Sequence, residues 1–217
     1  MEYLKIPSIY KFGAKSHVPE DFTDIFKALR GIQWRATEKV DGTNTRIIWD
    51  GYHITFGGRT DNAQIQPNVM EYLEKTFHAD GVEETFEQVF GKKPAIVFGE
   101  MFGPKIQKEG GLYGEQVAFR VFDVYIDGYW LSWLNVADVA AKLGLDTVHY
   151  LGEDTLNNWL DYVSANPASF INSQHEMEGV VCTPVYPLYN RDGTPIKVKI
   201  KIKDIRAAKR GFLGEEK

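Results

Sequence analysis

Cysteine is almost absent from this chain of 217 residues, which contains only Cys182. A single cysteine cannot form an internal disulfide, and its apolar setting, GVVCTP, is typical of a buried thiol rather than a nucleophile. No apolar run approaches the ~20 residues that a membrane-spanning helix needs. The first residues, MEYLKIPSIYKFG, also lack the continuous apolar segment of a secretory signal. We therefore expect a cytoplasmic protein with no membrane partner.

Positive charge is also scarce, because the 25 lysine and arginine residues are outnumbered by 30 acidic residues and the formal net charge is −5. This balance by itself argues against a nucleic-acid partner. The basic residues are concentrated, however, in residues 191–210, where only two acidic residues, Asp192 and Asp204, accompany them. The eight basic residues of this segment are Arg191, Lys197, Lys199, Lys201, Lys203, Arg206, Lys209 and Arg210. Such a segment can bind an anion or form a solvated edge strand, and composition does not decide between them.

Internal repeats and low-complexity tracts are absent as well, and the remaining patterns predict a mixture of strands and helices. Apolar alternation around the Asp50-Gly51 turn predicts a hairpin over residues 43–56. Helical spacing over 67–91, interrupted at Asp80-Gly81, predicts two helices. Further strands are predicted at 95–102, 117–126, 178–184 and 196–203, and further helices at 153–165 and from an Asn135 cap to Leu143. Antiparallel strand runs with helices in blocks between them favour α+β over a doubly wound α/β fold.

Two segments of the first half place a charged side chain where it can meet a ligand. Lys39 follows the strand-like WRATE and precedes the Asp41-Gly42 turn, which holds a lysine at a strand end. Glu100 lies in an apolar strand between Gly99 and Met101-Phe102-Gly103, and an unpaired buried carboxylate is costly. A solvated turn lysine and a solvent-facing glutamate are the structural alternatives.

Three later segments likewise allow both a functional and a purely structural interpretation. Phe119 shares one face of its strand with Val121 and Asp123 by alternation, and it can stack on a base or pack in a core. Glu178 begins an apolar strand and can bind a metal or face solvent. Strict alternation in KVKIKIK sends the ammonium groups of its four lysines, 197–203, to one face of a strand. Because like charges repel there, the pattern favours either a bound polyphosphate or an edge protected from aggregation.

The order and spacing of these five segments resemble the covalent nucleotidyltransferase superfamily of polynucleotide ligases and mRNA capping enzymes. The segments TEKVDGTN and EGVVCTPVYPLYNRDGTPIKVKIK look most like the RNA ligase 2 branch, and the resemblance covers roughly residues 34–203. It implies an α+β, ATP-grasp-like nucleotidyltransferase fold with mainly antiparallel sheets enclosing a nucleotide cleft and helices packed outside. It also implies that residues 1–217 form one catalytic domain without an OB fold or a C-terminal accessory domain.

The same resemblance implies a mechanism and a set of site residues. Lys39 attacks the α-phosphorus of ATP to give lysyl-AMP, and AMP then passes to a 5′-phosphate end that a 3′-hydroxyl joins. An unperturbed lysine has a pKa near ~10.4, so neighbouring cations are expected to favour the neutral amine. Carried over by motif, the site assignments name the following residues: Glu38 beside the adenine edge, Asn44 among the nucleotide ligands, Arg59 on the AMP or end phosphate, Glu100 on the ribose, Phe119 stacked on adenine, Glu178 on Mg²⁺ or Mn²⁺, and Lys199 and Lys201 on the triphosphate.

Several alternatives stay open at this point. Spacing from Glu178 selects Lys199 and Lys201, and Lys201 with Lys203 is the shifted register. The leading function is an ATP-dependent RNA ligase in RNA repair, with RNA ends or nicks as substrate. A minimal DNA ligase, a capping guanylyltransferase, and a nucleotide- or RNA-binding module of a larger repair assembly are the alternatives. A protein partner is the expected replacement for the accessory domain.

Overall fold

The computed structural model describes residues 1–13, 19–108 and 110–213 and divides the chain into two compact units. The first unit comprises Met1–Leu4 and Asp41–Val148, and the second comprises Lys5–Val40 and His149–Lys217. Each unit has its own buried hydrophobic cluster. In the described part of the chain, no helix is both long enough and apolar enough to cross a bilayer.

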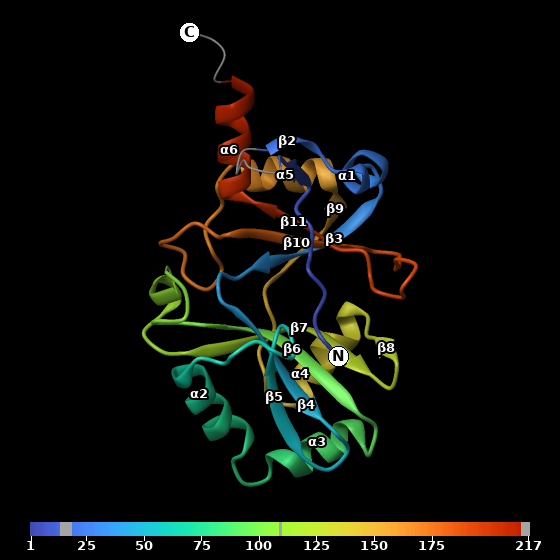
Figure 1. Ribbon diagram of the computed structural model, residues 1–217, viewed down its shortest axis with the longest axis vertical. Helices are drawn as coiled ribbons and strands as arrows, with labels where there is room; N and C mark the ends of the chain where they lie inside the picture. The colour runs from blue at the N-terminus through green and yellow to red at the C-terminus, as the bar shows by residue number, and fades with distance from the viewer. Residues whose placement is uncertain (14–18, 109, 214–217) are drawn as a thin grey trace. The chain divides into compact units, whose positions relative to one another are not determined.

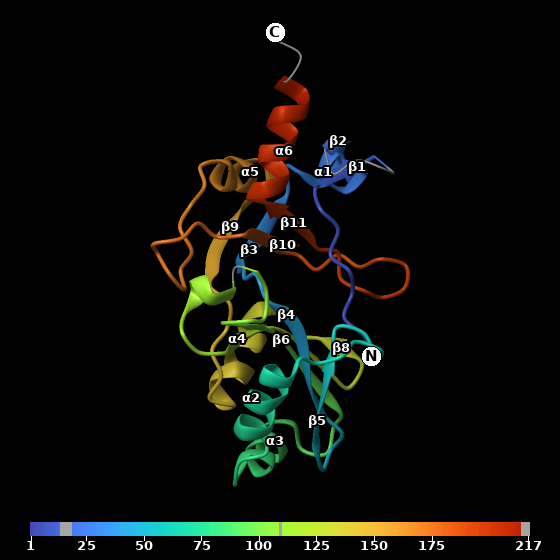
Figure 2. The same ribbon diagram turned by 60° about the vertical axis from the view of Figure 1, so that its left-hand side comes forward.

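The first unit is built on a five-stranded antiparallel sheet with the order β5-β4-β6-β7-β8. Three helices, α2, α3 and α4, pack against one face of this sheet, where their apolar residues share a core with alternate strand residues (Figures 1 and 2). The bounds are β4 Thr43–Trp49, β5 Ile54–Gly58, α2 Pro67–Phe77, α3 Val82–Phe90, β6 Ala95–Phe102, the 3-10 helix η1 Gly110–Tyr113, β7 Ala118–Ile126, β8 Tyr129–Trp130 and α4 Trp133–Lys142.

The predicted hairpin and the pair of helices are confirmed in this unit. The Asp50 carboxylate accepts the backbone N–H groups of Tyr52 and His53, at 2.8 and 2.7 Å, and so closes the turn between β4 and β5. α2 begins at Pro67, whose fixed φ suits a first helical turn. α3 follows Gly81, which has a left-handed φ of 82°. Local sequence thus determines this stretch of chain.

A β-bulge in β7 overturns one prediction from alternation. Gly99 pairs with Val121 and Phe98 pairs with Asp123, so Phe122 is an extra residue between the two pairs. The side chain of Val121 lies in the helix-covered core. Asp123 instead accepts a short hydrogen bond from the hydroxyl of Tyr3. The prediction that Phe119, Val121 and Asp123 share one face is therefore wrong, because the bulge reverses the alternation after Val121.

The second unit is built on a four-stranded antiparallel sheet with the order β11-β10-β3-β9. Helices α1, α5 and α6 contribute to the core on one face of it, together with Trp34, Val180 and Ile200 from three of the strands (Figure 1). The bounds are α1 Asp24–Leu29, β3 Gln33–Lys39, β9 Tyr150–Thr155, α5 Leu156–Ser164, β10 Gly179–Pro184, β11 Val198–Lys201 and α6 Ile202–Leu213.

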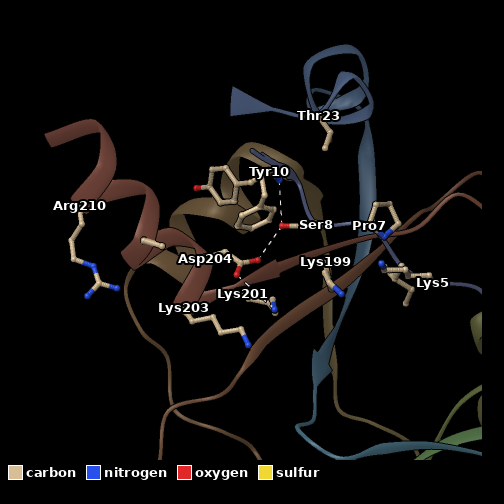
Figure 3. A pocket seen from close by; sticks show the side chains of 13 residues that line it. Lys5, Pro7, Ser8, Tyr10, Thr23, Lys199, Lys201, Lys203, Asp204 and Arg210 are labelled. Atoms are coloured by element: carbon tan, nitrogen blue, oxygen red, sulfur yellow. Dashed lines mark hydrogen bonds and ion pairs between the residues drawn. The ribbon is translucent and has the colours of Figure 1, made fainter. Parts of the chain in front are cut away.

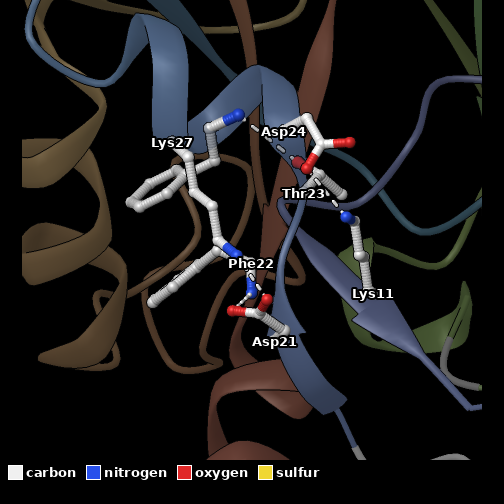
Figure 4. Close-up of polar contacts among 7 residues, drawn as sticks. Lys11, Asp21, Phe22, Thr23, Asp24 and Lys27 are labelled. Atoms are coloured by element: carbon white, nitrogen blue, oxygen red, sulfur yellow. Dashed lines mark hydrogen bonds and ion pairs between the residues drawn. The ribbon is translucent and has the colours of Figure 1, made fainter.

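A two-stranded ribbon precedes α1 in the second unit and is formed by β1 (Tyr10–Phe12) and β2 (Pro19–Phe22). Figure 4 shows the polar contacts around it: Lys11 pairs with Asp24 at 2.8 Å, and Lys27 pairs with Asp21. The Thr23 hydroxyl caps α1 by accepting the N–H of Phe26 at 3.4 Å. Because both ion pairs are exposed, we expect them to contribute only a little to stability.

Three predicted element boundaries in the second half of the chain are wrong. α4 has Ser132 at its N-cap, so Asn135 lies inside the helix. α5 begins only at Leu156, because residues 153–155 continue strand β9 and the Thr155 side chain caps the helix. The strand predicted at 196–203 ends at Lys201, and α6 begins at the next residue, Ile202. The mainly antiparallel α+β class is nevertheless confirmed.

Candidate functional site

Lys39 lies at the end of β3, and its ammonium nitrogen Nζ is 2.5 Å from the Glu178 carboxylate oxygen Oε2. The two residues are 139 positions apart in sequence, and the pairing of β3 with β10 brings them together. Both side chains are partly exposed, at 22% and 17%. The described structure therefore joins the two predicted residues in one ion pair at a solvent-accessible strand end.

Strand register places two more lysines on the same face of this sheet. Gly179 of β10 pairs with Lys39 on one side and with Lys201 on the other. One step along, Val181 pairs with Lys199. Because directly paired residues of an antiparallel sheet project to the same face, the three lysines share the face that the helices leave uncovered. The intervening residues, such as Val180 and Ile200, are fully buried on the other face.

This geometry shows which lysines of the segment lie on the strand. Lys199 and Lys201 are the two lysines of β11, whereas Lys203 lies in the first turn of α6 and is exposed. Lys197 precedes the strand and is buried. The prediction that all four ammonium groups share one strand face is therefore wrong, because the strand is only four residues long.

Gly179 allows strands β10 and β11 to approach each other closely. Its φ is 153°, and a Cβ added there would lie 2.0 Å from the carbonyl oxygen of Ile200. A side chain at this position would push β11 away from β10, and with it Lys199 and Lys201. The Glu-Gly sequence that begins β10 thus combines a charged side chain with a backbone that only glycine fits.

Burial and like charge act together on the two strand lysines. The pKa of Lys199 is lowered first by burial, then by the charges of Lys201 and Lys39. The pKa of Lys201 is also lowered by burial, against the opposing effect of Asp204, whose carboxylate lies 3.6 Å from its ammonium group. The face therefore holds positive charge that is partly removed from water, which favours an anionic ligand.

Glu38 points away from this face. It is 1% exposed, and its carboxylate accepts hydrogen bonds from the Ser169 hydroxyl at 2.5 Å and from the Phe170 N–H at 3.1 Å. Since Glu38 and Lys39 are neighbours on a strand, their side chains project to opposite sides. The Glu38 carboxylate therefore anchors the loop at residues 169–170, and its expected contact with adenine stays a prediction.

In the first unit, Asn44 and Glu100 are directly paired across β4 and β6. Both are partly buried, and they lie on the sheet face opposite the α2–α4 core. The Asn44 side-chain oxygen Oδ1 is buried and has no hydrogen-bond partner among the described residues. A buried polar atom without a partner is costly, so this oxygen favours a ligand that donates a hydrogen bond to it.

The Asp41-Gly42 turn is held by polar contacts within the first unit. The Tyr113 hydroxyl accepts the N–H of Asp41 at 3.0 Å, and the Gln107 amide donates to the carbonyl of Gly42 at 3.1 Å. A Cβ on Gly42 would lie 2.2 Å from the carbonyl oxygen of Met101. Glycine at position 42 is thus required by a close approach to β6.

Arg59 is exposed in the loop after β5, and a buried arginine positions that loop. Arg46, 2% exposed, donates to the carbonyls of Gly58 and Met1, both at 2.6 Å, and pairs with Asp61 at 2.8 Å. Arg46 therefore fixes both ends of the turn that carries Arg59, which leaves the Arg59 side chain toward solvent.

Two phenylalanines of β7, Phe119 and Phe122, lie on opposite faces of the first unit's sheet. Phe119 is 5% exposed in the helix-covered core, and its ring packs over Gly99, where an added Cβ would lie 2.2 Å from it. Phe122, the bulged residue, is only partly buried and packs 5.1 Å from the ring of Tyr3. Sequence reasoning did not single out Phe122, because alternation alone does not show which face of the sheet the helices leave open, and the expected stacking of Phe119 on adenine stays a prediction.

The described residues fit a divalent cation only with help from a ligand. No group of three or more metal-binding side chains occurs within residues 1–13, 19–108 and 110–213. Glu178 is the carboxylate beside Lys39. Mg²⁺ is commonly bound by one or two carboxylates together with substrate phosphates and water, so a phosphate-bearing ligand would have to supply the remaining oxygens.

Comparisons with known proteins identify the family and the fold of this chain. The RNA ligase family model matches residues 32–199. No curated protein matches the sequence. Similar solved structures include mutants of Naegleria gruberi RNA ligase, one with AMP and Mn and one with ATP and Mn, both at 17% identity, with TM-scores of 0.62 and 0.64. They align with 93% and 97% of this chain but with only 60% and 62% of their own.

A further Naegleria gruberi RNA ligase structure, with PPi, is also 17% identical, with a TM-score of 0.61 over 98% of this chain and 61% of that one. This chain thus spans about 60% of the length of the structures that it resembles. At such identity the structures show the fold, which is the predicted nucleotidyltransferase fold, and the family model covers most of the chain. The chain belongs to the RNA ligase family.

Proposed function

We propose that this protein is an ATP-dependent RNA ligase that carries AMP covalently on Lys39. The observation that carries the proposal is the grouping of Lys39, Glu178, Lys199 and Lys201 on the open face of one sheet. Membership of the RNA ligase family supports it, as do the AMP, ATP and Mn named for the similar Naegleria gruberi structures.

The first reaction would transfer AMP to the lysine. The neutral Lys39 amine attacks the α-phosphorus of ATP, a nitrogen–phosphorus bond forms, and the bond from that phosphorus to the pyrophosphate oxygen breaks. One amine proton is lost, and pyrophosphate leaves with the bonding electron pair. Lys199 and Lys201 would stabilise the negative charge on the phosphate oxygens. Their positive charge also disfavours the protonated form of Lys39 and so promotes attack.

Glu178 has two roles in this scheme. Its carboxylate holds the Lys39 ammonium group at the strand end while the amine is protonated. When ATP is bound, Glu178 would hold Mg²⁺ or Mn²⁺, which supplies charge neutralisation for the phosphates. Release of Glu178 from the lysine would remove the carboxylate that favours the charged amine.

The residues of the first unit would recognise the nucleoside and the phosphate end. Glu100 would accept hydrogen bonds from ribose hydroxyls, and the unpartnered oxygen of Asn44 would accept a further hydrogen bond from the nucleotide. Arg59 would offer its planar donors to a phosphate. We assign the stacking on adenine to Phe122, because Phe119 is packed in the core and Phe122 is partly open on the Glu100 side of the sheet.

The later steps are part of the same proposal. AMP would pass to the 5′-phosphate of an RNA strand, and a 3′-hydroxyl would then displace AMP to seal the strand, in RNA repair. Because the chain is acidic overall, with a formal net charge of −5, we propose that a protein partner assists in gripping RNA. The buried free thiol of Cys182 is consistent with the reducing cytoplasm.

Labelling with [α-³²P]ATP and a divalent cation tests the covalent step. We expect the wild-type protein to retain label after denaturation, Lys39→Ala to retain none, and the exposed control Lys209→Ala to label normally. A wild-type protein that binds ATP but never becomes labelled would exclude the mechanism. Labelling by GTP in place of ATP would favour a capping guanylyltransferase.

A panel of nicked substrates then tests the strand. Matched RNA, DNA and hybrid nicks bearing a 5′-phosphate are incubated with the labelled protein, and sealing is measured on denaturing gels. We expect the RNA nick to be sealed fastest. Preferential sealing of the DNA nick would make the protein a minimal DNA ligase. Failure to seal any of the three nicks would favour a binding module in a larger assembly.

A further inference from the structure

A cavity of about 720 Å³ lies within the second unit, on the side of Lys199 and Lys201 where the N-terminal segment and α6 meet β11 (Figure 3). Lys5–Ser8, Tyr10 and Phe12 form one wall. The backbone of this segment pairs with β11 through the hydrogen bonds of Lys199 with Pro7 and Ile9. One face of α6 forms another wall through residues 203, 207 and 210. Since ligand pockets range over about 300–1,000 Å³, this cavity can hold a nucleotide-sized ligand.

The cavity is strongly positive. Among the residues that the structure describes, five cationic side chains line it, namely Lys5, Lys199, Lys201, Lys203 and Arg210. The lining includes one carboxylate, Asp204, which accepts a hydrogen bond from Ser8 at 3.1 Å and lies 3.6 Å from the ammonium group of Lys201. That carboxylate is therefore already engaged, and the described lining residues carry a formal charge of 5 − 1 = +4. A protein of net charge −5 concentrates its positive field here.

An exposed aromatic ring accompanies these charges. Phe12 lines the cavity and is 40% exposed. Tyr10, which also lines it, is 7% exposed and stacks on Phe22 at 5.0 Å, so its ring already has a partner. An accessible aromatic face beside a positively charged groove is the combination with which proteins bind single-stranded nucleic acid.

We propose that this cavity binds the polynucleotide strand, with its backbone phosphates on Lys5, Lys203 and Arg210 and a base against Phe12. The inference rests on the proposed ligase function and adds the place where the strand is held beside the reactive lysines. Lys199 and Lys201 belong to both groups of residues, so a strand in the cavity has its phosphates next to the face that carries Lys39.

The same observations argue against a cavity built for pyrophosphate alone. Neither Lys39 nor Glu178 lines it, although a leaving pyrophosphate must depart from the atom that Lys39 attacks. A diphosphate also has no use for the ring of Phe12, and it would fill only a small part of about 720 Å³. A strand of several phosphates uses the charges of the N-terminal segment, of β11 and of α6.

Fluorescence anisotropy with a labelled 5′-phosphorylated oligoribonucleotide, without ATP, tests the proposal. The variant Lys203→Ala/Arg210→Ala removes two cations of the cavity. The matched control, Arg191→Ala/Lys209→Ala, removes one arginine and one lysine at exposed positions of the second unit outside the cavity lining. Phe12→Ala is measured separately against Tyr189→Ala, another exposed aromatic.

Each phosphate contact with single-stranded nucleic acid contributes about 0.7 to the slope of log affinity against log salt concentration. At 0.1 M salt, one such contact therefore raises the affinity roughly fivefold relative to 1 M salt. We therefore expect the cavity variant to lose about 25-fold in affinity and about 1.4 in slope, and the matched control to lose little. Phe12→Ala should weaken binding at least about fivefold by loss of stacking.

Equal losses in the cavity variant and the control would overturn the proposal, since binding would then follow net charge only. Loss of ATP labelling in the cavity variant with unchanged strand binding would also overturn it, because the cavity would then serve the triphosphate. Failure of the proposed ligase function can be distinguished from failure of this inference. The anisotropy assay contains no ATP, so it measures strand binding even by a wild-type protein that ATP does not label.

Discussion

Phe119 and Phe122 are three residues apart on β7, and truncation of each should affect a different property. Phe119 is 5% exposed, packs over Gly99 and makes an edge-to-face contact with Phe77 at 6.0 Å. Phe122 is partly buried, and its ring contact is with Tyr3. We expect Phe119→Ala to reduce stability and Phe122→Ala to reduce affinity for ATP.

The magnitude for Phe119 follows from its burial. Truncation of a core phenylalanine to alanine costs about 3–5 kcal/mol, because the lost transfer energy is joined by a cavity that collapses only in part. For a chain of this size, each kcal/mol lowers Tm by about 2–4 °C, so we expect a decrease of roughly 6–20 °C. The surviving folded protein should still bind ATP.

The magnitude for Phe122 follows from stacking. A base on an aromatic ring contributes about 1–3 kcal/mol by alanine substitution, which corresponds to roughly a 5- to 150-fold increase in the Kd for ATP. Its incomplete burial makes the expected loss of stability smaller than that for Phe119. Differential scanning calorimetry measures Tm, and isothermal titration with ATP well below Tm measures Kd.

The reverse result would refute this assignment. If Phe119→Ala kept its Tm within a few degrees and lost ATP binding, Phe119 would be the stacking residue, and its place in the α2–α4 core would be wrong. If Phe122→Ala bound ATP as tightly as wild type, Phe122 would not stack on adenine, and the bulge would have only a structural role in the sheet. The variant Phe119→Leu, which keeps most of the volume, separates loss of packing from loss of the ring.

Three further predictions concern single positions. Glu38→Gln replaces a buried acceptor of two hydrogen bonds by an amide that cannot accept both, so urea unfolding should show a loss of about 1.5–3 kcal/mol. Gly179→Ala should slow self-labelling far more than Gly193→Ala, because both have positive φ but only the first would meet backbone atoms. The pKa of His78 is raised mainly by its hydrogen bond with the carbonyl of Ile54. Its contribution to stability should be complete below about pH 6.5 and lost as pH rises through the folded pKa, and His78→Gln should abolish that dependence.

Much of the first unit could be predicted because its signals are local. The Asp50-Gly51 turn, Pro67 at a helix start and the interruption at Asp80-Gly81 each act within a few residues. Alternation correctly predicted β6 and the presence of β7. It failed at Phe122, because a bulge is decided by how β7 pairs with β6 and not by the residues of β7 alone.

The end of β11 shows a second limit of local reasoning. The run KVKIKIK keeps its alternation up to Lys203, so sequence predicts that the strand continues. The structure instead begins α6 at Ile202, where Ile202, Ile205 and Ala208 supply a helical stripe to the core of the second unit. Two periodicities overlap at Ile202, namely the strand alternation of KVKIKIK and the helical spacing of Ile202, Ile205 and Ala208. Tertiary packing decided between them.

The sequence by itself determined the chemistry available to this protein: a lysine before Asp-Gly, a glutamate before Gly179 and an alternating run of lysines, in an order that resembles RNA ligases. Tertiary structure alone decided which of these groups meet. It joined Lys39 to Glu178 across 139 residues, turned Glu38 into the core and put Phe119 under the helices. The physical reason is that side-chain types follow from sequence, whereas the face that each side chain takes follows from strand register and bulges, which depend on distant partners.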